Sequence, residues 1–347
     1  MNRLVNNNLD QSDMKKSISN FPLHIQKSFE IMKVWNCYNK YENISSVLIL
    51  GMGGSAIGGD VAKVISQDSC KVPIIINRSY EIPTWVNATT LVLASSYSGN
   101  TEETLTAFEK CHCLNCPIII LSTGGKILEY ALKYNLDSIV MESGLQPRAA
   151  LGFSFSLILL LLNRLNIIDN SVINLLENSI EPLIDLCSEL DSPNNLALKQ
   201  AKNIQSTCPI IYGSAELTWV VALRFRGQLA ENAKILSFHH IFPEQNHNEI
   251  EGWTLNKKIM QNMSIVWLED QDDHHGTKKR MELSKSLLKS YPKSHLTFSI
   301  EGPNRCERLL KLIHFTDWVS YYLALINNID PTPVKRIKKL KDMLSNE

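Results

Sequence analysis

The sequence has no apolar segment long enough to cross a bilayer. Its most apolar run, residues 153–162, is about half of the roughly 20 residues that a membrane-spanning helix needs, and it contains Ser154 and Ser156. Such a run is typical of a helix buried in a protein core. The N-terminal stretch MNRLVNNNLDQSDMKK also lacks the apolar core of a secretory signal. We therefore expect neither membrane insertion nor export.

An excess of charge of either sign is also absent, since Lys+Arg and Asp+Glu are 35 each. A balanced charge attracts neither nucleic acid nor an anionic membrane, so an anionic ligand has to be held by local groups. Cysteine is too sparse for a disulfide-built domain, with eight in 347 residues. We expect reduced thiols and a cytoplasmic protein.

The chain length suits two domains of ordinary size, and 44% hydrophobic residues suffice for two cores. Short β-rich runs alternate with helical stretches, which is typical of an α/β fold with parallel sheets covered on both faces. We predict a helical segment over 1–45, a first α/β domain over 46–150, a helical linker over 151–205, and a second α/β domain with a C-terminal helix over 206–347. The predicted strands are 47–50, 73–76, 91–94, 117–121 and 138–141 in the first domain, and 209–212, 263–268 and 295–300 in the second.

A glycine-rich segment, GMGGSAIGGD at residues 51–60, follows the first predicted strand and opens a helix. Gly54 and the glycines before it allow a tight turn and a close approach of the backbone to a ligand. Ser55 lies at the helix start, where unpaired amides and the helix dipole favour an anion. The segment is not the GxGxxG of dinucleotide-binding folds, because Ala56 or Ser55 stands where a glycine is required. A plain strand-to-helix turn is the alternative.

Three hydroxyl side chains crowd a later turn, SSYSGNTEET at residues 95–104, again between a strand and a helix. Ser96, Ser98 and Thr101, together with helix amides, can hold a phosphate dianion without Lys or Arg. Capping of the helix by Ser98 or Thr101 is the alternative, but it accounts for one hydroxyl rather than three. The two turns together predict a phosphate site.

Glu231 and His247 are candidates for acid–base chemistry in the second domain. Glu231 is predicted to end a helix, where the negative end of the helix dipole disfavours an ionised carboxylate, a condition that suits a general base. Taken alone, such a residue is more often a solvated helix-end charge. His247 lies in a polar segment, NHNE, and an imidazole can pass protons in either direction near neutral pH. The adjacent His239 and His240 leave a metal site as an alternative, although they lack the HxxxH spacing.

A compact cluster of Cys111, His112, Cys113 and Cys116 precedes a predicted strand. The cluster lacks the second CxxC pair of the usual structural zinc site. Small apolar cysteines between a helix and a buried strand explain it as well. We predict no bound metal and leave any other role of the cluster open.

The turns GGS and SYSGNT resemble those of the sugar isomerase (SIS) domain, a parallel sheet flanked by helices. With PRAAL, ENAK, NHNEI and DPTPV, they form six ordered segments over nearly the whole chain. These resemble the bifunctional phosphoglucose/phosphomannose isomerases of the phosphoglucose isomerase superfamily. The resemblance implies two SIS domains and the metal-independent interconversion of glucose 6-phosphate and mannose 6-phosphate with fructose 6-phosphate, as in glycolysis and gluconeogenesis, without a cofactor.

The resemblance also implies a role for each matching residue. Glu231 corresponds to the base that moves a proton between C1 and C2, His247 to the residue that opens the sugar ring, and Arg148 to the arginine beside the enediolate. An inter-domain salt bridge is the alternative for Arg148. The family's histidine comes from the other subunit, so we expect a homodimer with shared active sites. The phosphate would be bound by Gly54, Ser55, Ser96, Ser98 and Thr101.

The family further uses a lysine near the C-terminus, for which this sequence offers several. In a helix, Lys341 shares a face with Val334, Ile337 and Leu344, which we expect to point inward. Lys338 and Lys339 have polar neighbours at the corresponding offsets. We therefore predict that Lys341 is the catalytic lysine.

Two other functions remain open at this point. Another SIS enzyme with a different phosphosugar substrate would keep the hydroxyl turn but has no need for the segment with Glu231 and His247. A non-catalytic regulator that binds sugar phosphates would usually carry a DNA-binding helix-turn-helix or a basic surface, and the balanced charge gives no sign of either.

Overall fold

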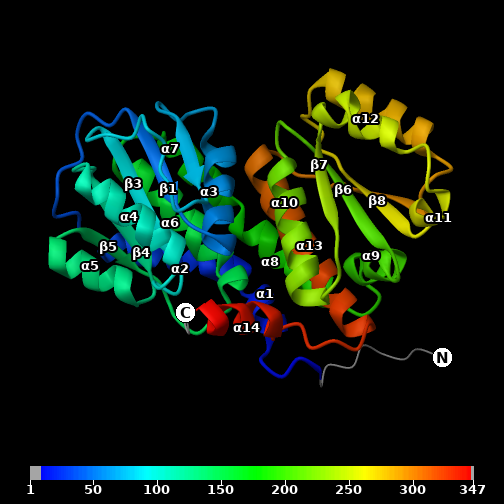
Figure 1. Cartoon of the computed structure of the whole chain (residues 1–347), viewed down its shortest axis with the longest axis horizontal. Coiled ribbons are helices and arrows are strands. Elements are labelled where there is room, and N and C mark those ends of the chain that lie inside the picture. Colours follow the sequence, from blue (N-terminus) through cyan, green and yellow to red (C-terminus); the bar gives the residue numbers. More distant parts are fainter. Residues whose placement is uncertain (1–8, 345–347) are drawn as a thin grey trace. The chain divides into compact units, whose positions relative to one another are not determined.

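The computed structural model describes residues 9–344, which divide into two compact units. The N-terminal unit comprises residues 19–184, and the C-terminal unit comprises residues 185–344 together with 9–18. Each unit contains one parallel sheet with helices on its faces (Figure 1). The predicted α/β class with two helix-flanked parallel sheets is confirmed.

The sheet of the N-terminal unit has the strand order β2-β1-β3-β4-β5. Its strands are β1 (Ser46–Leu50), β2 (Ile74–Asn77), β3 (Thr90–Ser96), β4 (Ile118–Ser122) and β5 (Asp137–Val140). The helices of this unit are α2 (Phe21–Val34), α3 (Gly53–Ser66), α4 (Glu102–Cys113), α5 (Lys126–Tyr134), α6 (Leu151–Arg164) and α7 (Asn170–Asn178), while α1 (Met14–Ser19) and α8 (Ile180–Asp191) run across the division between the units.

These strands read as continuous apolar runs because helices cover both faces of the sheet. Leu48 and Val92 pack in one hydrophobic cluster with Phe108 of α4. On the other face, a Cβ placed on Gly59 of α3 would lie 3.1 Å from the side chain of Ile49. Helix α3 therefore lies against the sheet at van der Waals distance, which fixes the position of its N-terminus at the carboxyl edge.

The segment 151–205, predicted as a linker, is shared between the two units. Every residue from 151 to 162 in α6 is buried, and α6 packs against α2 and α3 within the N-terminal unit. A helix that is apolar all round requires a core on every side. The later helix α9 (Leu196–Ile204) packs instead on α13 (Arg305–Ile326) in the C-terminal unit.

The sheet of the C-terminal unit has the strand order β7-β6-β8-β9. Its strands are β6 (Cys208–Ser214), β7 (Phe238–Phe242), β8 (Met263–Leu268) and β9 (Ser294–Phe298). Besides α9 and α13, its helices are α10 (Trp219–Gln228), α11 (Lys257–Met260), α12 (His275–Leu288) and α14 (Lys335–Leu344). The sequence did not predict β7, which is an edge strand with Phe238 55% exposed.

Each face of this second sheet also has its own core. Tyr212 and Trp267 pack with Met281 of α12 in one cluster. On the other face, the ring of Phe298 lies 6.1 Å from that of Phe225 in α10 and 5.2 Å from that of Phe315 in α13. Helices α10 and α13 are thereby held together, and α10 leads directly into the segment with Glu231.

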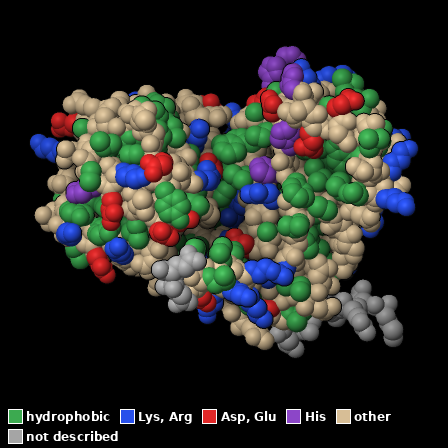
Figure 2. All heavy atoms as spheres, in the orientation of Figure 1, with side chains coloured by type: hydrophobic (Ala, Val, Ile, Leu, Met, Phe, Trp, Pro, Cys, Tyr) green, Lys and Arg blue, Asp and Glu red, His purple; other side chains and the backbone are tan. Residues whose placement is uncertain are grey.

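None of the helices between residues 9 and 344 combines the length and apolar character that a bilayer crossing needs. Acidic and basic side chains intermingle on the face of the N-terminal unit drawn in Figure 2. This agrees with the equal numbers of acidic and basic residues and leaves anion binding to local groups.

Candidate active site

The first glycine-rich turn connects β1 to α3 at the carboxyl edge of the sheet. A Cβ on Gly51 would lie 3.0 Å from the carbonyl oxygen of Ser95 in β3, so a side chain there would push the two segments apart by a few tenths of an ångström. Met52 precedes α3 and gives it no side-chain cap, so a ligand can accept hydrogen bonds from the first amides of the helix. Ser55 is buried in this first turn.

The second turn, between β3 and α4, holds its hydroxyls together. The Ser96 hydroxyl donates to Thr101 Oγ1 at 3.1 Å, and the Asn100 N–H donates to Ser98 Oγ at 3.3 Å. Thr101 occupies the N-cap position of α4, but its side chain does not cap the helix. Capping by Thr101, the alternative weighed from the sequence, is therefore not what the structure shows.

A left-handed glycine shapes the same turn. Gly99 has φ +70°, and a Cβ there would come within 1.8 Å of the carbonyl oxygen of Gly124. Any other residue would displace the backbone that follows β4. The glycine therefore sets the path of the chain between Ser98 and Thr101.

The two turns lie side by side because β1 and β3 are paired neighbours in the sheet. Ligands of parallel α/β sheets bind at this carboxyl edge. The N–H of Tyr97 donates to Ser55 Oγ at 3.3 Å, which joins the turns directly. The structure thus brings Ser55, Ser96 and Thr101 to one edge of the N-terminal unit.

Arg148 belongs to a short 3₁₀ turn, Pro147–Ala149, that lies against the start of α3. A Cβ on Gly54 would lie 2.5 Å from the carbonyl oxygen of Pro147, so this contact requires glycine. The Arg148 side chain is buried, with 4% of its surface exposed. A buried guanidinium next to the glycine-rich turn is well placed to stabilise negative charge.

Glu231 lies in a π-helical turn, Leu229–Ala233, that continues α10. Such turns occur frequently at functional sites. The next residue, Asn232, is buried and donates to Ser320 Oγ of α13 at 2.9 Å. Lys234, at φ +59°, ends the turn and donates to the carbonyl oxygens of Glu231 and of Pro331, the latter at 3.0 Å. These contacts fix the backbone that carries the half-buried Glu231.

His247 ends a 3₁₀ turn, Glu244–His247, and is exposed. The residues around it are anchored: Asn246 donates to Ser284 Oγ of α12 at 2.9 Å. The following turn, Glu249–Gly252, is held by Glu249, which accepts a hydrogen bond from the Tyr212 hydroxyl. An exposed imidazole on an anchored backbone is available to a ligand or to a neighbouring molecule.

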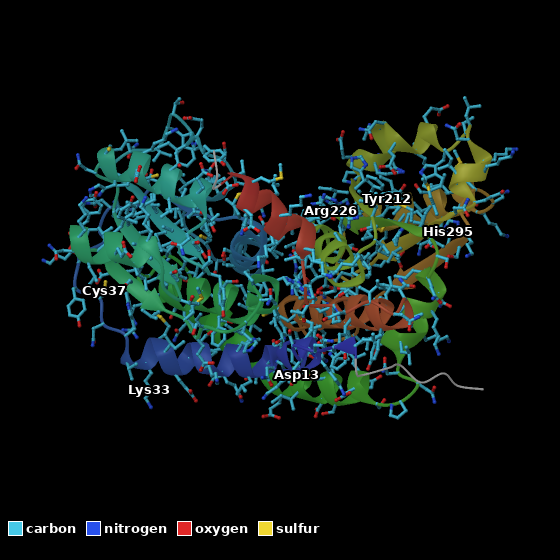
Figure 3. All side chains as sticks on the ribbon, turned by 60° about the horizontal axis from the view of Figure 1, so that its bottom comes forward. Asp13, Lys33, Cys37, Tyr212, Arg226 and His295 are labelled. Carbon is cyan, nitrogen blue, oxygen red and sulfur yellow. The ribbon has the colours of Figure 1, made fainter. Side chains whose placement is uncertain are left out.

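Tyr212 links this segment to the core of its unit, and Figure 3 shows it on β6. The Trp253 indole N–H donates to the Tyr212 hydroxyl at 3.0 Å. Nδ1 of His240 lies 3.2 Å from Glu249 Oε2. Burial, followed by the neighbouring Glu249 carboxylate, raises the pKa of Tyr212. The Tyr212 hydroxyl therefore stays protonated and continues to donate.

Lys341 lies in α14, which has no buried residue. Of the side chains expected to point inward with it, Ile337 is 44% and Leu344 55% exposed, and Val334 is half-buried. The expected inward face is thus not buried within the described chain, because α14 follows the last core helix without packing closely on it. The preference for Lys341 over Lys338 and Lys339 stays a prediction.

In the C-terminal unit, the turn between β6 and α10 corresponds to the first glycine-rich turn of the N-terminal unit. The side chain of Asp273 occupies it. The Ser214 hydroxyl donates to Asp273 Oδ1 at 2.5 Å, and the Asp270 N–H donates to Asp273 Oδ2 at 2.9 Å. The Ser214 N–H is taken up by Thr218 Oγ1 at 2.7 Å. Asp273 is 5% exposed, and burial raises its pKa to about 6. A carboxylate thus occupies this second turn.

The cysteines and histidines considered as metal ligands do not gather. Cys111 and Cys116 belong to the hydrophobic cluster beneath α4, whereas Cys113 is exposed. His239 and His240 are consecutive in β7, so they point to opposite faces of the sheet. Between residues 9 and 344, no three side chains of His, Cys, Asp or Glu come together as a metal site.

Solved structures with the same fold cover nearly all of the chain. A hypothetical protein of Thermus thermophilus superposes with a TM-score of 0.73 at 14% identity, over 95% of this chain and 89% of that one. The C-terminal domain of glucosamine-fructose-6-phosphate aminotransferase from Francisella tularensis gives a TM-score of 0.66 at 16% identity, over 92% and 97% of the two chains. At these identities the similarity shows the fold alone.

Sequence relatives are more informative. A family model described as the bacterial phospho-glucose isomerase C-terminal SIS domain matches residues 193–344. A bifunctional phosphoglucose/phosphomannose isomerase from Caldicellulosiruptor bescii is 42% identical over 96% of this chain and 99% of its own length. One from Thermoplasma acidophilum is 33% identical over 87% and 90% of the two chains. Such similarity over almost the whole length, with hydroxyl-lined turns in place, shows that the chain belongs to the bifunctional phosphoglucose/phosphomannose isomerase family.

Proposed function

We propose that this protein interconverts glucose 6-phosphate and mannose 6-phosphate with fructose 6-phosphate through a cis-enediolate. The family relationship supports this reaction class, and the observation that carries the site is the hydroxyl pair of Ser96 and Thr101 beside Ser55. The site binds phosphate at the carboxyl edge of the N-terminal sheet. Its donors are the hydroxyls of Ser55, Ser96, Ser98 and Thr101 and the backbone at Gly54.

Neutral donors suffice for a dianion in this position because two helices begin there. The amino ends of α3 and α4 each present a partial positive charge. Glu102 and Glu103 in the first turn of α4 use part of that dipole, so the start of α3 supplies most of the attraction. Charge-assisted hydrogen bonds to an anion are about twice as strong as neutral ones.

Glu231 acts as the base. It removes the proton from C2 of the open-chain aldose; the C2–H bonding pair forms the C1=C2 double bond, and the carbonyl π pair moves onto the C1 oxygen to give the enediolate. The proton of the C2 hydroxyl passes to the C1 oxygen, the C2–O bond becomes the carbonyl of the ketose, and the same carboxyl group returns its proton to C1. Arg148 stabilises the negative charge that develops on the C1 and C2 oxygens, a contribution commonly worth about 3 kcal/mol per donor. The substrate's own carbonyl acidifies the transferred proton, so the sequence of steps uses no metal ion and no nucleotide.

His247 and Lys341 assist ring opening by moving protons between the ring oxygen and the anomeric hydroxyl. Both lie on exposed elements of the C-terminal unit. We infer that His247 serves the active site of a neighbouring subunit in a homodimer, which agrees with an exposed side chain on an anchored turn. We place the enzyme in the cytoplasm, where its substrates are made.

Both hexose phosphates are accepted because they differ only in configuration at C2. Proton removal from C2 erases that difference, so glucose 6-phosphate and mannose 6-phosphate give the same enediolate. Which epimer forms in the reverse direction depends on the face of C2 that receives the proton. One carboxylate that reaches both faces, or a rotation about the C2–C3 bond, yields both products.

A coupled assay tests the proposal. Purified protein with fructose 6-phosphate and a metal chelator should form glucose 6-phosphate and mannose 6-phosphate, each detected by its own coupling enzyme. The E231Q variant should lose about 10²–10⁴-fold in kcat with little change in KM. A protein that binds fructose 6-phosphate but forms neither product would instead be a regulator or an enzyme for another phosphosugar. A relative described as a D-glucosamine-6-phosphate 4-epimerase, 32% identical over 59% of this chain, makes glucosamine 6-phosphate the first alternative substrate to assay.

A further inference from the structure

Tyr97 occupies an unusual position between the two serines of the hydroxyl turn. Its backbone N–H donates to Ser55 Oγ at 3.3 Å, and its carbonyl oxygen accepts from the Thr123 hydroxyl at 2.7 Å. These backbone contacts join the glycine-rich turn, the hydroxyl turn and the end of β4. The residue is thus a junction of three segments.

The side chain of Tyr97 connects a fourth segment to this junction. Its hydroxyl donates to the carbonyl oxygen of Glu142 at 2.9 Å and accepts from the Leu145 N–H at 3.0 Å. Both partners lie in the loop after β5, and Arg148 follows Leu145 by three residues. The Tyr97 side chain is 8% exposed, so water competes little for these two hydrogen bonds.

We propose that Tyr97 is a positioning residue that sets the distance between the phosphate cradle and the guanidinium of Arg148. The proposal rests on the isomerase function proposed above. The loop 142–148 enters its 3₁₀ turn at Pro147, and Pro147 also approaches Gly54 of the cradle closely. The Gly54 contact limits how closely the loop can approach α3, and the two hydrogen bonds of the Tyr97 hydroxyl keep the loop from moving away.

The chemistry of a phenol suits this task. Burial raises the pKa of Tyr97 more than the Leu145 N–H lowers it, so the hydroxyl remains neutral and can donate and accept at once. Phenylalanine would keep the ring in place and lose both hydrogen bonds. Because the phosphate is bound by other residues, a loosened tether should affect the step that Arg148 serves and leave phosphate binding intact.

The test is the kinetic behaviour of Y97F. We expect kcat for fructose 6-phosphate to fall about tenfold or more, since small displacements of a catalytic group cost up to about 100-fold. KM, and inhibition by inorganic phosphate as a probe of the cradle, should change less than about threefold. A wild-type kcat in Y97F, or a rise in KM without a fall in kcat, would overturn the proposal.

The matched control is Y41F in the same unit. The Tyr41 hydroxyl donates to Asp137 Oδ2 at 2.9 Å, at the amino end of β5 and hence at the opposite edge of the sheet. Y41F should lower the thermal unfolding midpoint at least as much as Y97F does, but leave kcat unchanged. If both variants lose kcat in proportion to their loss of stability, Tyr97 is only structural.

A double-mutant cycle tests whether Tyr97 acts through Arg148. In an R148A background, Y97F should reduce kcat no further, whereas independent effects would multiply. If Y97F does not fold, T123V is the second variant, because it removes the hydrogen bond from the Thr123 hydroxyl to the Tyr97 carbonyl oxygen. T123V should also lower kcat, and a wild-type kcat in T123V would then overturn the proposal. A wild-type protein without isomerase activity would overturn the proposed function instead, so the two failures are distinguishable.

Discussion

Arg224 and Asp317 form a buried, two-pronged ion pair between α10 and α13. Nε and Nη2 of Arg224 lie 2.9 and 2.6 Å from the two carboxylate oxygens, and both side chains are 4% exposed. Gln228 adds a hydrogen bond to Asp317 Oδ1 at 2.9 Å. Arg224 lies about two helical turns before Glu231, so the pair holds the helix that leads into the turn with the proposed base.

Loss of this pair should destabilise the C-terminal unit strongly. We expect D317N to lower the free energy of unfolding by about 3–5 kcal/mol, because it leaves the Arg224 charge buried without its counter-ion. Urea unfolding followed by tryptophan fluorescence measures this free energy. The control is D191N, because the Asp191 carboxylate pairs with Lys15 at 2.5 Å but is 43% exposed; D191N should lower the free energy of unfolding by less than about 1 kcal/mol. Equal losses in the two variants would contradict the expectation that the buried ion pair matters more than the exposed one.

The hydroxyl pair should matter for binding rather than for the fold. Removing Ser96 Oγ in S96A should raise KM for fructose 6-phosphate roughly tenfold or more, as expected for a hydrogen bond to a charged group. S45A is the matched control. The Ser45 hydroxyl lies 2.6 Å from Thr89 Oγ1 just before β1 and β3 begin, and hence at the opposite edge of the sheet from Ser96. S45A should leave KM unchanged, and a KM change shared by both variants would indicate a general effect on the sheet.

The contact between Gly54 and Pro147 should be sensitive to a single added methyl group. A Cβ at position 54 would lie 2.5 Å from the Pro147 carbonyl oxygen, so G54A must displace either the start of α3 or the turn that carries Arg148. We expect kcat to fall about tenfold or more with a modest loss of stability of about 1–3 kcal/mol. The matched control is G124A. A Cβ added to Gly124 would meet no atom within 4 Å, so this variant should retain full activity.

The stability of the protein should depend on pH through Asp273. Its pKa is raised from 3.8 to about 6 by burial, so between these values the folded chain holds a proton that the unfolded chain releases. The stabilisation is therefore absent above pH 6, grows as the pH falls through that value, and is complete below the unfolded pKa. Between about pH 7.5 and pH 5, wild type should gain roughly 1 kcal/mol relative to D273N.

Urea unfolding of both proteins at the two pH values measures this difference. The buried His24 and His314, whose pKa values burial lowers to about 4 and about 3, are present in both proteins, so their opposing contribution cancels. A stability difference that stays constant with pH would show that Asp273 does not titrate in this range.

The sequence predicted those elements whose local residue pattern matches the place that the element takes in the folded chain. Continuous apolar runs such as residues 47–50 identified strands buried on both faces, and glycine-rich or hydroxyl-rich turns after them identified the carboxyl edge of the first sheet. β7 was missed because an edge strand needs no continuous apolar run, and its central residues include His239 and His240. The apolar run at residues 153–162 correctly predicted a buried helix. The run did not indicate that this helix, α6, would pack in the N-terminal unit.

The candidate site could be predicted only as far as local patterns reach. Ser96, Ser98 and Thr101 lie in one turn, so their proximity follows from sequence alone. The proximity of Gly54 to Pro147, and the tether from Tyr97 to the loop after β5, depend on tertiary contacts that no periodicity reveals. Lys341 was chosen by the apolar face of its helix, and since α14 has no buried residue, burial does not distinguish Lys341 from Lys338 or Lys339.

The carboxylate of Asp273 also has a consequence that we expect to see in the number of substrate molecules bound per chain. Its chain has two sheets of similar design, but the second strand-to-helix turn already contains an anion that the protein itself supplies. Each polypeptide should therefore take up a single equivalent of sugar phosphate, and calorimetric titration should saturate at one equivalent per chain.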